Sequence, residues 1–118
     1  GEGKPYGPEK LCWSYGERVG RRDSFYCTHI SSAQRLPNGN TLVTQGPQGI
    51  LFEVTPEREE VWRYISPCCS DDDHASFTRQ GDSRTGGRYS LFTGLKYAAS
   101  FGAFKGRTLT PGPCLEAT

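Results

Sequence analysis

The chain has 118 residues, of which 34% are hydrophobic, 15 are glycine and 8 are proline, so a helical bundle is not expected. Its 14 basic and 13 acidic side chains are interspersed and leave a net charge of +1, so no nucleic-acid partner is expected. This composition predicts one thinly cored domain, which a partner outside the chain would help to hold.

The predicted organisation has four parts. Residues 1–9 form an N-terminal tail, and residues 10–67 form a β-meander with a preceding outer strand at Lys10–Tyr15. Residues 68–88 are polar and predict a long surface loop. Residues 89–118 contain a further strand at Tyr89–Tyr97 and an extended tail with aromatic anchors.

The middle of the chain predicts four short antiparallel strands joined by tight turns. The strands are Thr28–Leu36, Thr41–Thr44, Ile50–Val54 and Glu60–Ile65. The turns are Pro37–Asn40, Gly46–Gly49 and Thr55–Arg58. Asn38-Gly39 is the strongest hairpin signal, and it predicts a turn in which both central residues have positive φ.

A W-x-Y pattern occurs twice, at Trp13-Ser14-Tyr15 and at Trp62-Arg63-Tyr64, 49 residues apart. Four strands in a unit of about 40 to 50 residues are typical of a β-propeller blade. Strand spacing places the Trp and Tyr of each pair on one face, which favours packing between neighbouring blades over a carbohydrate-stacking surface. The fold class is therefore all-β, a blade-like meander with flanking strands and tails.

Five cysteines, Cys12, Cys27, Cys68, Cys69 and Cys114, leave at least one thiol unpaired within the chain. Two disulfides with one free thiol fit an oxidising compartment, and five reduced thiols fit as well. The adjacent pair Cys68-Cys69 would bridge only as a strained ring, so these two thiols are expected to face different partners.

Methionine is absent, so either an N-terminal segment has been removed or the reading frame is truncated. A removed targeting segment would place the protein in a secreted, periplasmic or organelle-lumenal space. No stretch approaches 18 apolar residues, so no transmembrane segment is expected.

Residues 29–42, with the run A-Q-R-L-P-N-G-N-T-L, are followed by F-E-V-T-P at 52–56 and V-W-R-Y at 61–64. This ordered set resembles a blade of the arylsulfotransferase-like β-propeller proteins. The segment Gly106–Pro113 is similar to the G-[RK]-D-L-T-P close of such proteins. The resemblance covers roughly residues 10–67 and 89–116, one blade and parts of two, where a full ring of the family has about six.

The resemblance implies a fold and, for the enzymes of the family, sulfuryl transfer through a histidine near the channel axis. In that interpretation His29 is the nucleophile and Arg35 neutralises a sulfate oxygen. A strand-end histidine bonded to backbone groups is favoured instead, because the missing blades would supply the electrostatic environment of such a transfer. No catalytic residue is therefore assigned.

A second polar cluster contains metal-ligand residue types: Cys68, Cys69, Asp71, Asp72, Asp73 and His74. Adjacent cysteines do not suit a zinc tetrahedron, and the aspartates lack the glycine and final glutamate of a calcium loop. A solvated acidic loop is favoured, and no metal or cofactor is expected.

A lone blade leaves apolar surface and two unpaired sheet edges. The function expected first is therefore a non-catalytic interaction subunit, a truncated arylsulfotransferase-like propeller docked on a larger assembly. A membrane-bound energy-converting complex, with peripheral association, is one candidate assembly. The alternatives are a C-terminal fragment of a sulfotransferase-like propeller enzyme and a secreted binding module.

Overall fold

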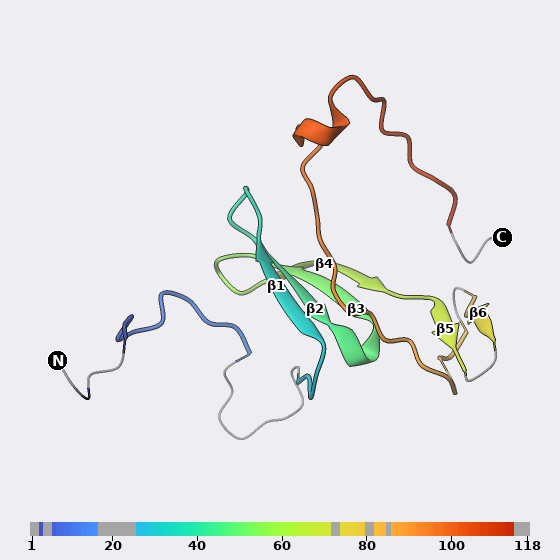
Figure 1. The fold of residues 1–118 in the computed structure, drawn as a ribbon, viewed down its shortest axis with the longest axis horizontal. Coiled ribbons are helices and arrows are strands. Elements are labelled where there is room, and N and C mark those ends of the chain that lie inside the picture. Colours follow the sequence, from blue (N-terminus) through green and yellow to red (C-terminus); the bar gives the residue numbers. More distant parts are fainter. Residues whose placement is uncertain are drawn as a thin grey trace.

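The computed structural model describes residues 3, 6–16, 26–71, 74–79, 82–84 and 86–114. Four strands form one antiparallel sheet in the order β1-β2-β3-β4, with bounds Ser31–Arg35, Thr41–Gln45, Ile50–Val54 and Glu60–Ile65 (Figure 1). The short strands β5 (Cys68–Ser70) and β6 (Ala75–Phe77) form a second sheet. In the described part of the chain the only helices are single 3-10 turns, η1 (Gly46–Gln48) and η2 (Gly102–Phe104). The all-β, antiparallel prediction is confirmed.

The hairpin between β1 and β2 is present, but its turn differs from the predicted one. Gly39 has a φ of +88°, while Asn38 is not among the residues with positive φ. The amide of Gly39 donates to Leu36 (3.0 Å) and the amide of Leu36 donates to Asn40 (2.8 Å), which makes a three-residue loop. Pro37 fixes its own φ near −65°, so the loop takes a right-handed turn and a single left-handed residue follows.

The loop between β3 and β4 repeats this geometry with a less suitable residue. The amide of Arg58 donates to Thr55 (2.9 Å), and the amide of Thr55 donates to Glu59 (2.8 Å). Arg58 therefore occupies the position that Gly39 takes in the first hairpin, at a φ of +74°. A residue with a Cβ atom is strained there.

Arg58→Gly is expected to raise the free energy of unfolding by about 0.5 to 1 kcal/mol. The change removes a left-handed strain of roughly 1 to 2 kcal/mol, and the added freedom of the unfolded chain takes back part of that gain. Urea unfolding followed by circular dichroism measures the difference. Gly39→Ala is the matched control and is expected to shift stability by a similar amount in the opposite direction. A destabilised Arg58→Gly variant would contradict this account.

A β-bulge interrupts the pairing of β3 with β4. Val54 pairs with Glu60 and Glu53 pairs with Trp62, so Val61 is the additional residue. The bulge brings Glu60 and Arg63 to one face of the strand, where they form two hydrogen bonds of 2.6 Å. These bonds lower the pKa of the Glu60 carboxyl and raise that of the Arg63 guanidinium.

Three sequence predictions need correction. Lys10–Tyr15 and Tyr89–Tyr97 are not strands, since neither segment belongs to a sheet ladder. A strand needs a neighbouring strand for its backbone hydrogen bonds, and here Trp13 and Tyr15 of the first segment and residues 91–96 of the second contact faces of the four-stranded sheet instead. The predicted polar loop 68–88 contains β5 and β6, which pair from Cys68 with Phe77 to Ser70 with Ala75.

Alternation along the strands divides the sheet into two faces. The Gln34 face carries the side chains of Ser32, Gln34, Leu42, Thr44, Leu51, Glu53, Trp62 and Tyr64. The Phe52 face carries those of Ala33, Arg35, Thr41, Val43, Ile50, Phe52, Val54 and Arg63. The main hydrophobic cluster, Val43, Phe52 and Val54, lies on the Phe52 face.

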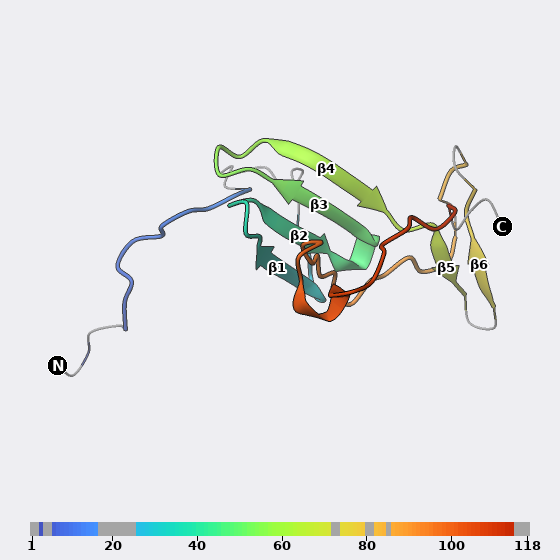
Figure 2. The ribbon, with the colours of Figure 1, turned by 90° about the horizontal axis from the view of Figure 1, so that it is seen from above.

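Figure 2 shows the sheet from above, with the N-terminal segment reaching the end of the sheet near the turn between β3 and β4. Among the described residues, no helix has the length and apolar character needed to cross a bilayer.

Candidate functional site

Residues 91–96 form an extended segment that lies across the Gln34 face, where it contacts side chains of β1, β2 and β3. The Gln34 amide group donates to the carbonyl of Lys96 (3.0 Å) and accepts from its N–H (2.8 Å). The N–H of Gly94 donates to the Thr44 hydroxyl at 3.0 Å. Side chains of the sheet therefore satisfy the backbone of this segment in place of a neighbouring strand.

A buried carboxylate anchors the same segment. Glu53 is 4% exposed, and its carboxylate accepts hydrogen bonds from Lys96 (2.5 Å), Asn40 (2.6 Å) and Asn38 (3.4 Å). The Lys96 ammonium also lies 5.3 Å from the centre of the Trp62 ring. The hydrogen bonds from Lys96 and Asn40 hold the pKa of Glu53 below its usual value, against the opposing effect of burial.

Lys96→Met is expected to lower the free energy of unfolding by about 2 kcal/mol at neutral pH, because a buried carboxylate loses its cation. Since the folded-state pKa of Glu53 is depressed, the stability it contributes is present above the unfolded value of about 4.3 and is lost as pH falls through the folded pKa. Urea unfolding at neutral pH and near pH 3 measures the effect.

The difference between the native chain and Lys96→Met is therefore expected to shrink in acid. Lys105→Met removes the charge of an exposed lysine and serves as the matched control. Equal losses at both pH values would show that Lys96 acts through packing and that its charge on Glu53 is unimportant.

Trp13 and Tyr15 pack on the Phe52 face, against the hydrophobic cluster of Val43, Phe52 and Val54. Their rings stack with centroids 6.3 Å apart, and the Tyr15 ring lies 5.9 Å from the Phe52 ring. The indole N–H of Trp13 donates to the carbonyl of Pro56 at 2.8 Å, and the Arg35 guanidinium lies 5.0 Å from the centre of the Trp13 ring. Both rings are thus held in packing contacts with the sheet.

The second aromatic pair repeats this geometry on the opposite face. Trp62 and Tyr64 stack with centroids 6.4 Å apart, and each of the two pairs has an interplanar angle of 9°. The cation of Lys96 stands over Trp62 as that of Arg35 stands over Trp13. In each W-x-Y pair the tryptophan ring therefore makes a cation–π contact, Trp13 with Arg35 and Trp62 with Lys96.

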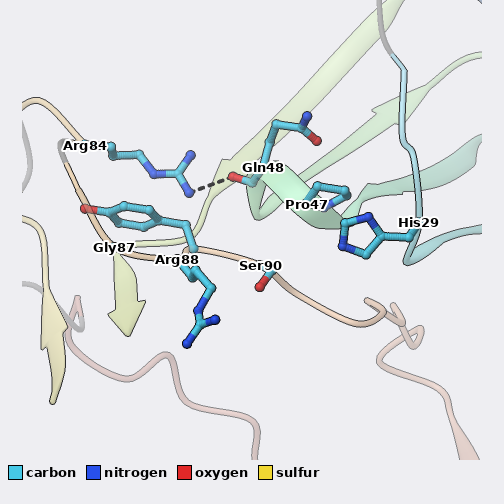
Figure 3. A pocket seen from close by; sticks show the side chains of 8 residues that line it. His29, Pro47, Gln48, Arg84, Gly87, Arg88 and Ser90 are labelled. Carbon is cyan, nitrogen blue, oxygen red and sulfur yellow. Dashed lines mark hydrogen bonds between the residues drawn. The ribbon is translucent and has the colours of Figure 1, made fainter. Parts of the chain in front are cut away.

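His29 lies in a pocket of about 390 Å³ beside η1, together with residues of the segment 84–90 (Figure 3). The Arg84 guanidinium donates to the carbonyl of Gln48 (2.6 Å) and lies 4.0 Å from the centre of the Tyr89 ring. Its Nε atom is buried without a hydrogen-bond partner in the described structure. In Figure 3 the side chain of Arg88 points away from Arg84 and His29, so the two guanidinium groups and the imidazole do not converge on one point.

Arg35 does not lie in this pocket. It follows His29 by six positions at the far end of β1, roughly 20 Å away for an extended chain. Its guanidinium donates to the carbonyl of Gly39 at 2.8 Å and contacts Trp13. The imidazole Nδ1 of His29 lies 2.7 Å from the Thr28 hydroxyl. The structure therefore separates the two residues named for a sulfate site and places Arg84 and Arg88 near the histidine instead.

All five cysteines are free thiols, and Cys68 and Cys69 are consecutive residues of β5. Across the described ranges, no group of three or more His, Cys, Asp and Glu side chains is placed to hold a metal ion. Asp72 and Asp73 lie outside these ranges. The amide of His74 donates to the carboxylate of Asp71 at 2.9 Å, which closes the turn between β5 and β6.

In comparisons with known proteins, no family model, no curated protein and no solved structure matches this chain. The arrangement of the described residues thus defines an antiparallel sheet that extended segments cover on both faces.

Two parts of this arrangement were missed from the sequence. Glu53 interrupts the apolar run Ile50–Val54, and a carboxylate in a buried strand needs a charged partner, so this position was a usable signal. Nothing in the sequence pointed to Lys96 as that partner, 43 residues away. Arg84 reaches η1 from a polar segment without periodicity, and no sequence rule would have placed it there.

Proposed function

We propose that this chain is a non-catalytic structural and interaction subunit, a truncated arylsulfotransferase-like propeller docked on a larger protein assembly. The observation that carries the proposal is the matched covering of the sheet. One W-x-Y pair packs on the Phe52 face with Arg35, and the other receives Lys96 on the Gln34 face. Such repeated contacts suit a unit that stacks on similar neighbours.

The exposed surface supports the same proposal. The chain has 9769 Å² of accessible surface, about 1.5 times the area expected for a compact protein of its mass. Large apolar side chains contribute to it, among them Phe92 at 80% exposed and Leu95 at 60%. An area of this kind is typical of a protein that is covered by a partner.

The native mass tests this proposal. The protein isolated from its source under mild conditions is expected to run well above 13.0 kDa, in a fixed ratio with other polypeptides. Light scattering after size exclusion gives the mass, and mass spectrometry gives the composition. A monomeric chain that unfolds cooperatively would contradict the proposal.

The second candidate is a C-terminal fragment of a sulfotransferase-like propeller enzyme. It is favoured by the pocket that His29 and Arg84 both line, because a guanidinium group in a pocket wall suits an anionic ligand. Sulfate transfer from an aryl sulfate to a phenol, measured on the isolated chain, tests it. Activity lost in His29→Ala and retained in Arg35→Lys would favour the enzyme and would contradict a purely structural role.

A further inference from the structure

A groove of about 470 Å³ lies on the Phe52 face, between the Trp13–Tyr15 segment and strands β1 and β2. Trp13 and Tyr15 line one side, and Ser31, Ala33 and Val43 are among the sheet residues that line it. None of its lining residues is charged. The groove is thus shaped by small side chains and two aromatic rings.

The exposure of β1 shows which side of this strand is uncovered. Ser32 and Gln34 are partly buried beneath residues 91–96, whereas Ser31, Ala33 and Arg35 are exposed. The two partly buried side chains are those that face residues 91–96, so the difference in exposure follows the covering segment. An equivalent segment on the Phe52 face would bury Ser31 and Ala33 in the same way.

A threonine on each face gives a second observation. On the Gln34 face the Thr44 hydroxyl accepts the N–H of Gly94. On the Phe52 face the Thr41 hydroxyl, which belongs to a lining residue of the groove, is buried and has no hydrogen-bond partner among the described residues. Leaving a buried hydroxyl unsatisfied costs about 1 to 3 kcal/mol, so this position suits an additional donor.

We infer that the groove binds an extended β-strand of a separate polypeptide, with small, uncharged side chains facing Ala33 and Val43. This inference rests on the proposed function and names the chemistry of the partner. The absence of charge along the groove excludes a strongly charged segment. The rings of Trp13 and Tyr15 stack on one another and Arg35 lies over Trp13, so a sugar would have to displace these contacts.

A second copy of the chain is a poorer occupant. If a second copy docked on the groove, we expect it to do so with the face that already binds an extended segment in this chain, which is its Gln34 face. In every copy residues 91–96 already cover that face through Gln34 and Thr44. The copy would therefore have to lose these hydrogen bonds before it could dock.

The experiment uses the full chain with Trp62→Phe, which leaves Trp13 as the only tryptophan. The probe is a blocked nonapeptide in which serine alternates with alanine and valine, so that it carries no charge and is not a segment of this chain. Its titration is expected to change the Trp13 fluorescence saturably. Ala33→Phe fills the groove and is expected to weaken binding at least tenfold, while Ala33→Ser is the matched control and keeps the affinity.

The inference would be overturned by no saturable change at millimolar peptide, by equal binding to Ala33→Phe, or by self-association of the chain that Ala33→Phe abolishes. Saturation by an oligosaccharide without binding of the peptide would overturn it as well. The native mass separates this test from the proposed function. If the native protein is a large assembly but the chain does not bind the peptide, only the inference about the groove is wrong. If the native protein is a monomer that binds the peptide, only the proposed function is wrong.

Discussion

Phe52→Ala is expected to lower the free energy of unfolding by about 4 kcal/mol, a large part of the roughly 5 to 15 kcal/mol that stabilises a typical domain. The Phe52 ring is 1% exposed and belongs to a buried cluster with Val43 and Val54. It also contacts Tyr15 and lies 5.4 Å from the Arg63 guanidinium. Removing it leaves a cavity and detaches the N-terminal segment from the sheet.

Urea unfolding followed by circular dichroism measures this loss. Phe92→Ala removes the same side chain from a position that is 80% exposed and is expected to change stability by less than about 0.5 kcal/mol. If Phe52→Ala is too unstable to measure, Phe52→Leu is expected to fall between the two. A loss below about 1 kcal/mol for Phe52→Ala would show that the sheet does not depend on this cluster.

Local sequence signals predicted the four-stranded sheet closely. The predicted strands Ile50–Val54 and Glu60–Ile65 have the observed bounds, and Thr41–Thr44 is one residue short of β2. The predicted Thr28–Leu36 is too long, because β1 begins only after Ile30, which has a φ of +42°. These strands are short, and turn residues fix their ends. Their register follows from the hairpins, so each pairing depends on residues that are close in the sequence.

The segments on the two faces could not be predicted in the same way. Residues 91–96 lie about 50 to 60 positions from the side chains that bind them, such as Thr44 and Gln34. The blade interpretation predicted a strand at Tyr89–Tyr97, and the structure has a segment there that belongs to no sheet ladder. Whether such a segment joins a sheet depends on a free neighbouring edge, which local periodicity does not encode.

The sulfate-site hypothesis shows a further limit. Its two residues, His29 and Arg35, come from the resemblance to the sulfotransferase-like blade, and they lie before the start and at the end of one short strand. A strand advances about 3.3 Å per residue, so the two ends of β1 cannot share a small ligand. The arginines that line the pocket with His29 are Arg84 and Arg88, which follow the β5–β6 hairpin within the predicted polar loop.

Gly46→Ala is the second substitution with a large expected effect, because two backbones meet at this glycine. A Cβ atom on Gly46 would lie 1.8 Å from the carbonyl oxygen of Ile30 and 2.6 Å from that of Leu91. The carbonyl of Gly46 also accepts the N–H of Leu91 at 2.9 Å. Neither backbone can move aside cheaply, since Ile30 leads into β1 and Leu91 begins the segment that covers the Gln34 face.

We expect Gly46→Ala to lower the free energy of unfolding by about 3 kcal/mol and to loosen residues 91–96 before the sheet itself unfolds. Hydrogen exchange is then faster at the amides of Leu91 and Gly94, while the amides within β2 and β3 keep their protection. Gly102→Ala is the control, since a Cβ atom there meets nothing within 4 Å. Unchanged exchange at Leu91 in a stable Gly46→Ala variant would mean that the covering segment does not depend on this close approach.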